Sequence, residues 1–497
     1  MARIVVLGAG VCGLAGAMML ARDGHDVVVL ERDRARAPHA PEHAWTDWER
    51  PGVTQFRLAH LLLPAGRAVL EDELPETIAS LTEAGAARFD LLSGMPPTIA
   101  DRRPRPGDER FVTLTARRPV LEQALARVAD GQELEVRRGV TVTGLMSHPR
   151  GTRPHITGVR TESGEEIPAE LVVDATGRRS RLPQWLSAIG ARAVQQESED
   201  SGFSYYQRTF RSADGTVPTL MAPVGSPLGT ILLVTLPADN GTWAVVIATS
   251  SRDQPLKRLR DERAWSAVVR ACPLHAHWLQ GEPITPVEAM GGLIDRSRRL
   301  APDGRPVATG IAAVADAWAC TNPSLGRGIS YGLRHAQRLR DTVREHLHDP
   351  AAFALAWDHI TEDEMRPFYD DVMAENRLRR DEMDALRDGR QPPRPDARNM
   401  QFLATALHDA DVFRGYLETR AALATTREVL GRKELAERID RLASPAPRPL
   451  PGPDRAQLLD LLAGTRIGDA EQPGPRRTQR RPVTQEQRDH FDMPLVS

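Results

Sequence analysis

The stretch Ile4-Val5-Val6-Leu7-Gly8-Ala9-Gly10-Val11-Cys12-Gly13 decides the fold of this chain. Its apolar start predicts a buried parallel strand, and the residues that follow place apolar side chains at helical spacing as far as Gly24. A second apolar run, 27–30, then ends in Glu31. A strand, a glycine-rich turn, a helix, a second strand and an acid in this order are typical of a dinucleotide-binding β-α-β unit.

Each part of this unit has a role in holding a dinucleotide. Gly8 allows the tight turn, Gly10 lets backbone N–H groups approach a pyrophosphate, and Gly13 lets helix and strand pack closely. The helix N-terminus offers N–H donors and a positive dipole to the phosphates. Glu31, which follows Gly13 by 18 residues, can accept hydrogen bonds from ribose hydroxyls. The alternative is a glycine-rich turn that binds no ligand.

The composition of the chain bounds its partners and its environment. Its 497 residues are enough for two or three domains, and a net charge of −2 gives no reason to expect nucleic acid as a partner. Cys12, Cys272 and Cys320 lie far apart, which indicates a reducing compartment and no dithiol centre. We expect no metal site, because no cluster of metal ligands stands out. The uncharged run 4–21 is broken by glycines, so we expect a cytoplasmic protein with neither a signal peptide nor a membrane span.

Changes of pattern along the chain indicate an α/β domain that is interrupted by a β-rich insertion. Short β-rich runs between 201 and 250 predict an antiparallel sheet, and the α/β pattern returns at 307–314 before a long helix at 325–346. The segment 38–60, rich in His, Trp and Pro, predicts a long surface or lid loop. The boundaries we predict are 1–195 and 296–346 for the two parts of the α/β domain, 196–295 for the β-rich domain, 347–465 for a helical C-terminal region and 471–497 for a disordered tail.

Two later strands also end in an acid that is followed by a glycine turn. Asp174 closes one apolar run and precedes Gly177, and Asp316 closes another and precedes the loop 322–328. Ligands of open α/β sheets bind outside the carboxyl ends of the strands, so all three loops can meet one elongated ligand. An aspartate after a strand is also a common helix cap, which is the alternative for each motif taken alone.

Together the three motifs resemble the FAD-dependent monooxygenases of the para-hydroxybenzoate hydroxylase fold, over about residues 1–345. The resemblance implies a Rossmann-like FAD-binding domain with an inserted antiparallel β-sheet substrate domain and a helical C-terminal region. Two positions depart from the pattern: Ala175 follows Asp174 where hydroxylases often have glycine, and Ala315 precedes Asp316 in place of the usual glycine. The residues that the resemblance assigns to FAD are Gly8, Ala9, Gly10, Val11, Cys12, Gly13, Glu31, Arg32, Arg118, Asp174, Asp316, Pro323, Gly326, Arg327, Gly328 and Ile329.

The resemblance also implies a reaction, that of a monooxygenase of secondary metabolism. NAD(P)H would reduce FAD, and a C4a-hydroperoxyflavin formed with O2 would pass one oxygen atom to an electron-rich aromatic, polyketide or alkene substrate. Asp316 would hold the ribityl or pyrophosphate part of FAD, and the loop 323–328 would lie along the isoalloxazine ring. His60 is the candidate for proton transfer, with a loop histidine that only packs as the alternative.

Two other functions stay open at this point. One is an FAD-dependent reductase or dehydrogenase acting on a lipid-like or natural-product substrate, and the other is a non-redox enzyme built on the flavin scaffold. The sequence leaves the substrate, the choice between NADH and NADPH, and the oligomeric state undetermined.

Overall fold

The computed structural model describes residues 1–442, 445 and 448–464. The predicted disordered tail at 471–497 lies outside the described residues. Among the helices in the described ranges, none has the length and apolar character needed to cross a membrane.

A five-stranded parallel sheet forms the centre of the N-terminal domain. Its strands run in the order β18-β9-β1-β2-β5, so the first strand of the chain lies in the middle of the sheet. In β9 all four residues are buried, because both faces of the sheet are covered. The bounds are β1 (Arg3–Leu7), β2 (Asp26–Glu31), β5 (Glu135–Arg138), β9 (Leu171–Asp174) and β18 (Ile311–Ala313).

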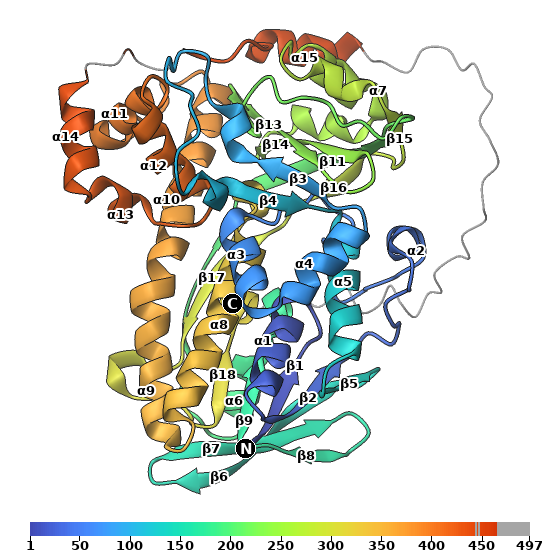
Figure 1. The fold of residues 1–497 in the computed structure, drawn as a ribbon, viewed down its shortest axis with the longest axis vertical. Coiled ribbons are helices and arrows are strands. Elements are labelled where there is room, and N and C mark those ends of the chain that lie inside the picture. Colours follow the sequence, from blue (N-terminus) through green and yellow to red (C-terminus); the bar gives the residue numbers. More distant parts are fainter. Residues whose placement is uncertain (443–444, 446–447, 465–497) are drawn as a thin grey trace.

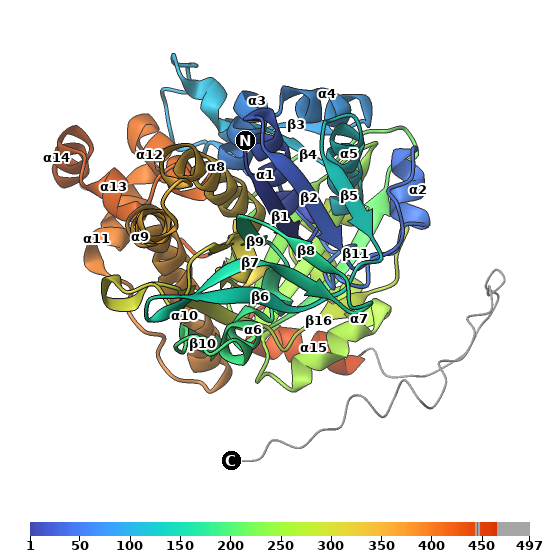
Figure 2. The ribbon, with the colours of Figure 1, turned by 90° about the horizontal axis from the view of Figure 1, so that it is seen from below.

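Alternating side chains of β1 contact different layers on the two faces of this sheet. Ile4 and Val6 pack among the helices of one face, whereas Val5 and Leu7 pack against a small antiparallel sheet on the other. Figure 2 shows the two layers on opposite sides of β1 and β2. The helices are α1 (Val11–Arg22), α5 (Arg118–Asp130) and α8 (Gly328–His346), and the small sheet is β6 (Val142–Arg150), β7 (Arg153–Thr161) and β8 (Glu166–Pro168).

Short elements surround this core. A helix at Pro41–Thr46 lies inside the segment 38–60, which we expected to be a surface loop, and Trp45 and Trp48 of this segment are buried. The short elements of the domain are α2 (Pro41–Thr46), α3 (Pro64–Glu73), α4 (Pro75–Glu83), β3 (Ala87–Asp90), β4 (Val112–Thr115) and α6 (Leu182–Ala188).

A second, antiparallel sheet lies above the first in Figure 1. One of its faces packs against the helices α7 and α15 (Arg455–Gly464), and the other faces the N-terminal domain and α10 (Arg366–Arg387). The strands are β11 (Phe203–Arg211), β12 (Gly225–Leu228), β13 (Ile231–Pro237), β14 (Thr242–Ser250), β15 (Glu282–Pro283) and β16 (Glu288–Met290), and α7 spans Glu262–Arg270. A separate three-stranded sheet is formed by β10 (Gln195–Asp200), β17 (Ile294–Arg299) and β19 (Ala319–Cys320).

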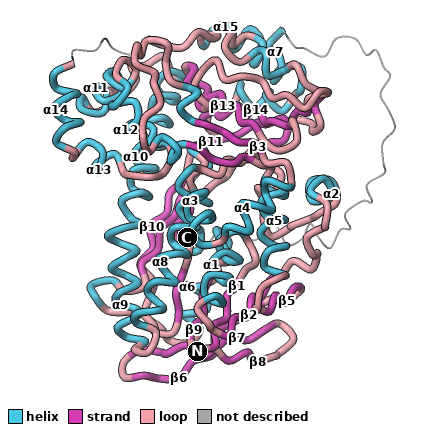
Figure 3. Tube along the Cα trace, in the orientation of Figure 1, coloured by secondary structure: helices cyan, strands magenta, loops and turns pink. Residues whose placement is uncertain are grey.

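The C-terminal part is helical and returns to the antiparallel sheet at its end (Figure 3). In α15, Leu458 and Leu462 are buried against that sheet, and Arg455 pairs with the buried Asp253 at 2.6 Å. This architecture confirms the predicted fold class. The helices are α9 (Pro350–Ile360), a π-helical turn (Thr361–Met365), α10 (Arg366–Arg387), α11 (Ala397–Ala406), α12 (Ala410–Arg420), α13 (Thr426–Leu430), α14 (Lys433–Arg441) and α15 (Arg455–Gly464).

One predicted helix begins later than expected. The helix expected at 325–346 starts at Gly328, because Gly326 adopts a left-handed conformation with φ +65° that ends the preceding 3₁₀ turn, η8 (Pro323–Leu325). Residues 326 and 327 therefore belong to the loop that follows β19, and the helix begins directly after them.

We expect the buried ion pair between Arg117 and Asp239 to hold the two domains together. Arg117 precedes α5, and Asp239 lies in the turn between β13 and β14. A terminal nitrogen of the Arg117 guanidinium lies 2.6 Å from Asp239 Oδ2, and the two side chains are 3% and 0% exposed. Asp239→Ala leaves the buried arginine with Glu42, whose side chain is 43% exposed, as its remaining carboxylate partner, so it should lower the free energy of unfolding by up to about 3–5 kcal/mol in urea titrations. Glu165→Ala, which removes the exposed partner of Arg137, is the control and should cost at most about 1 kcal/mol. Equal losses would contradict this role.

Candidate active site

The glycine turn after β1 is packed so closely that only some of its residues have room for a side chain. Gly8 has φ +99°, and a Cβ on it would lie 2.7 Å from the carbonyl oxygen of Ala175. A Cβ on Gly13 would collide with the carbonyl oxygen of Gly8. At Gly10, by contrast, no atom lies within 4 Å of the position of a Cβ. The fold itself therefore requires the first and third glycines, whereas Gly10 borders open space.

Two helices begin near this edge of the parallel sheet without a side-chain cap. The N-cap of α1 is Gly10 and that of α8 is Arg327, and neither residue has a side chain that accepts a hydrogen bond from the first turn. The first N–H groups of a helix have no partner inside it, and together with the helix dipole they favour an anion. The carboxyl edge of the sheet thus offers two sets of donors.

Asp174, at the end of β9, is buried and holds the loop that follows it. Its Oδ1 accepts hydrogen bonds from the N–H of Thr176 at 2.9 Å and from the Thr176 hydroxyl at 2.6 Å. Its Oδ2 accepts one from the Ser180 hydroxyl at 2.6 Å. The carboxylate is therefore engaged with its own loop.

Asp316 brings the second and third motifs together. Its Oδ1 would lie 3.8 Å from a Cβ on Gly328, and its Cβ would lie 4.0 Å from a Cβ on Gly177. The Nε of Arg178 lies 3.9 Å from Asp316 Oδ2. Loss of hydration raises the pKa of Asp316 above its ordinary value, and the positive charges of Arg178 and Arg118 offset part of that effect. The loops after β9 and β18 therefore meet around this carboxyl group.

The loop 322–328 is attached to the antiparallel sheet and to the C-terminal helices. The Tyr205 hydroxyl of β11 donates to Asn322 Oδ1, which also accepts from the N–H of Ser324. The side chain of Arg327 is 4% exposed and lies 3.4 Å from Glu375 of α10. The Arg327 guanidinium therefore pairs with α10, in a part of the chain that carries no motif.

Arg50, which the sequence did not single out, is the centre of a buried charge network. Its guanidinium contacts Glu31 at 2.8 Å, Asp33 at 3.1 Å and Glu122 at 2.9 Å. Burial works against this charge, but the carboxylates raise the pKa of Arg50 above its usual value. Glu122 also accepts from Arg118, at 2.8 Å. This network ties the segment that carries Arg50 to β2, to α5 and to the glycine turn.

Glu31 is part of this network, which limits what else it can bind. Its Oε2 accepts from the N–H of Ala9 and from Arg50, both at 2.8 Å, and its Oε1 accepts from the N–H of Asp33 at 2.9 Å. Both oxygens are thus already engaged within the chain, and a ribose would have to share them. The next residue, Arg32, is exposed.

Cys12 and Ile329 lie where α1 crosses the start of α8. The Cys12 thiol donates to the Ile329 carbonyl at 3.9 Å, and a Cβ on Gly332 would collide with its sulfur. Burial and the nearby Asp316 raise the pKa of Cys12 to about 12, so the thiol remains protonated. Val11 is buried in the core of the domain.

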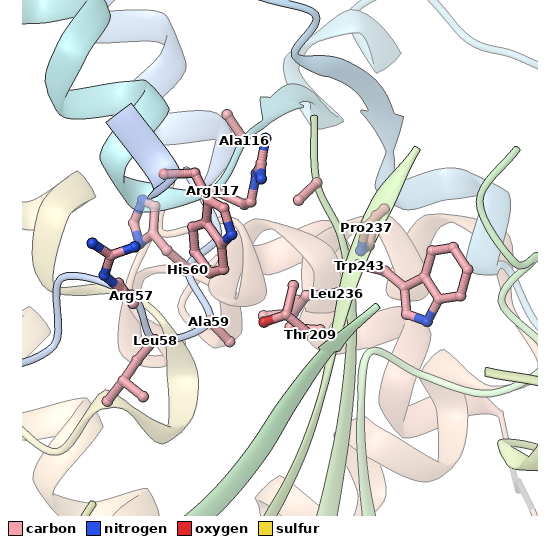
Figure 4. A pocket seen from close by; sticks show the side chains of 13 residues that line it. Arg57, Leu58, Ala59, His60, Ala116, Arg117, Thr209, Leu236, Pro237 and Trp243 are labelled. Atoms are coloured by element: carbon pink, nitrogen blue, oxygen red, sulfur yellow. The ribbon is translucent and has the colours of Figure 1, made fainter. Parts of the chain in front are cut away.

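His60 lies beside a small cavity between the two domains, of about 20 Å³. Figure 4 shows it with Arg117 from the N-terminal domain and with Thr209 and Trp243 from the antiparallel sheet. Its Nε2 is buried without a hydrogen-bond partner. Burial, with a smaller contribution from the positive Arg118, lowers the pKa of His60 to about 3, so the imidazole is neutral at physiological pH.

A comparison with protein families agrees with this geometry. The model of the FAD binding domain family matches residues 1–352. The chain belongs to this FAD-binding family. The match covers the glycine turn, both later motifs and the antiparallel sheet, so it confirms the predicted family and supports FAD as the ligand of the site.

Individual relatives are distant. The chain is 28% identical to "Protein Rv3254" of Mycobacterium tuberculosis, over 68% of its own length and 72% of that protein. Many solved structures share its fold, and two of them serve as examples. The Diels-Alderase PyrE3 of pyrroindomycin biosynthesis has a TM-score of 0.57 and 18% identity, and the match covers 85% of this chain and 80% of that one. PqsL of Pseudomonas aeruginosa, described as a probable FAD-dependent monooxygenase, has a TM-score of 0.56 and 19% identity, over 78% and 97%. The family match agrees with the predicted enzyme class, an FAD-dependent oxidoreductase, and the two solved structures agree with the fold.

The residues at the site fit FAD. The free space at Gly10, the uncapped first turns of α1 and α8, and the buried Nε of Arg178, which has no hydrogen-bond partner, provide room and donors for an anionic dinucleotide. In the part of the chain that the structure describes, no group of three or more His, Cys, Asp or Glu side chains is arranged to hold a metal ion.

The glycine turn yields a matched pair of variants. Gly10→Val should leave the apoprotein folded, because the side chain enters open space, but it should weaken FAD binding at least tenfold by occupying the place of the pyrophosphate. Gly13→Val should lower both the melting temperature and FAD binding, because it collides with Gly8. Fluorescence titration of the apoproteins and thermal melting measure the two effects. Unchanged flavin affinity in Gly10→Val would refute the assignment.

His60 should make the protein less stable in acid. Its pKa is about 3 in the folded protein and about 6.5 in an unfolded chain. Between these values the unfolded state binds a proton that the folded state does not, so stability falls as the pH falls from 6.5 towards 3. His60→Phe should therefore lose less unfolding free energy than the wild type between pH 7 and pH 5, measured in urea. A parallel loss in both proteins would show that His60 is not buried in its neutral form.

Proposed function

We propose that this protein is an FAD-dependent monooxygenase that inserts one oxygen atom from O2 into an electron-rich small organic molecule. The observation that carries the proposal is that the loops after β1, β9 and β18 meet at one edge of the parallel sheet, while the antiparallel sheet turns an apolar face towards the same domain. Aromatic rings, polyketides and alkenes are the substrate classes we propose, and NAD(P)H is the proposed reductant. FAD, when bound and reduced, supplies the activation of O2.

The antiparallel sheet offers the substrate surface in this proposal. Leu232 and Leu236 of β13 belong to the apolar clusters on the face that is turned towards the N-terminal domain. Gln207 of β11 is a polar exception: it accepts from the N–H of Ala59 at 2.6 Å and donates to the Arg57 carbonyl at 3.0 Å. An apolar surface with few fixed polar groups suits a flat organic substrate.

The chain itself contributes positioning and electrostatics rather than a strong acid and base. The first turn of α8 provides N–H groups and a positive dipole, which stabilise negative charge. Gln207 fixes the segment that carries His60 against the sheet. A neutral His60 can donate or accept a hydrogen bond at Nε2, the atom that lacks a partner here.

A second candidate function is a non-redox reaction on the same scaffold. It is favoured by the fold shared with PyrE3, a structure described as a Diels-Alderase. A flavin-dependent reductase or dehydrogenase of a lipid-like or natural-product substrate is the other alternative, since it needs the same FAD site.

Turnover in labelled oxygen separates these functions. The FAD-loaded protein is mixed with NADH or NADPH and a panel of phenols, naphthols and polyketide-like alkenes under ¹⁸O2. We expect substrate-stimulated oxidation of the nicotinamide and one ¹⁸O atom in the product by mass spectrometry. Turnover without oxygen, coupled to flavin reoxidation, would replace the proposal by the reductase, and turnover without flavin reduction would replace it by the non-redox enzyme. The Gly10→Val protein, which should bind FAD weakly, is the control: product that it forms at an undiminished rate does not depend on FAD.

A further inference from the structure

Ala315 holds a backbone conformation that normally belongs to glycine. Its φ is +53°, in the left-handed region, where an L side chain is strained. The residue directly precedes Asp316, the carboxyl group around which the later two motifs meet. Relaxation of this backbone to an ordinary conformation would displace Asp316, so the surrounding structure has to hold it.

The Ala315 carbonyl accepts a hydrogen bond from the N–H of Trp318 at 2.9 Å, and the side-chain contact that holds the turn comes from His335 of α8. The N–H of Ala315 donates a hydrogen bond to His335 Nδ1 at 3.2 Å. The imidazole is 1% exposed and stacks on Trp357 of α9, with ring centroids 4.4 Å apart and an interplanar angle of 12°. Trp318 packs against it edge-on, at 4.9 Å. The ring therefore has little freedom to turn away from the backbone that it contacts.

The hydrogen bonds around the ring define its protonation state. Nδ1 accepts from Ala315, so it carries no proton. On the other side, Nε2 lies 3.4 Å from the Thr361 hydroxyl, and this hydroxyl donates its own proton to the Trp357 carbonyl at 2.6 Å. Thr361 can then only accept, so the proton of the neutral ring lies on Nε2. Burial lowers the pKa of His335 to about 3, which keeps the ring neutral.

We propose that His335 is a positioning residue for FAD: its Nδ1 holds the left-handed turn at Ala315 and so places Asp316 at the cofactor site. Trp357 and Thr361 set the orientation and the tautomer of the ring. Through these two residues, the C-terminal helical region influences the position of Asp316 indirectly. This inference rests on the FAD-binding part of the proposed function and not on oxygen insertion.

Two substitutions of His335 separate this role from a purely structural one. His335→Phe keeps an aromatic ring to stack on Trp357 but has no acceptor, so we expect the FAD dissociation constant of the apoprotein to rise at least tenfold. His335→Asn loses the stack but keeps an acceptor near the position of Nδ1. We expect its melting temperature to fall further than that of His335→Phe, with an FAD dissociation constant within about threefold of the wild type. Quenching of flavin fluorescence and thermal melting of the apoproteins are the two measurements.

The same experiment in an Ala315→Gly background tests the link to the turn. Glycine adopts the left-handed conformation without support, so His335→Phe should there weaken FAD binding less than threefold. Thr361→Val, which removes the acceptor of the Nε2 proton, should also weaken FAD binding in the wild-type background and not in the Ala315→Gly background. It provides the test if His335→Phe does not fold.

Three results would overturn the proposal. They are equal FAD affinities for His335→Phe and His335→Asn, a loss in His335→Phe that is the same in the wild-type and Ala315→Gly backgrounds, and a lowered melting temperature with unchanged FAD affinity. A wild-type protein that binds no FAD would overturn both this inference and the proposed function. A protein that binds FAD but inserts no oxygen would refute the monooxygenase alone.

Discussion

The close crossing of backbone segments at the carboxyl edge of the parallel sheet is the constraint on which the rest of the structure depends. Gly13 has no room for a Cβ against Gly8, and Gly8 has none against Ala175. On α8, a Cβ at Gly332 would collide with the sulfur of Cys12 on α1. The glycine turn after β1, the loop after β9 and the start of α8 are far apart in the sequence, and they come into contact because the glycines at these contacts carry no side chain. The space that remains open, at Gly10, is bordered by the uncapped end of α1.

Buried charge is the second requirement of this edge, and it is met inside the protein. Arg50 lies among Glu31, Asp33 and Glu122, with its side chain 2% exposed. Buried carboxylates are costly unless they are paired and hydrogen-bonded, and here one guanidinium pairs with three of them. The same network fixes the start of the segment 50–60 that leads to His60. The segment that carries Arg50 is therefore held in place next to the glycine turn before any ligand binds.

The parts that could be predicted from the sequence are those whose signal is local. The three glycines of the first turn and the acids that end strands are recognisable because a turn, a close approach or a strand end requires a particular residue type at a fixed spacing. Arg50 could not be predicted, because it is one of many arginines and its partners lie on β2 and α5 and in the loop after β2. Arg327 was assigned to the cofactor loop by resemblance, and the pairing of its side chain with Glu375 depends on a helix that the resemblance did not cover.

The C-terminal helices illustrate why such contacts escape an analysis of motifs. Residues after about 345 carry no motif, yet they support both ends of the loop region between Ala315 and Arg327. Trp357 of α9 stacks on His335, which accepts from Ala315, and Glu375 of α10 pairs with Arg327. The alanine at 315 departs from the usual glycine, and that departure is tolerated where a second residue supports the turn. The alanine at 315 and the hydrogen bond to His335 are therefore related: the second supports the backbone conformation that the first has to adopt. Such compensation is visible only when residues distant in sequence are seen side by side, because packing and not spacing relates them.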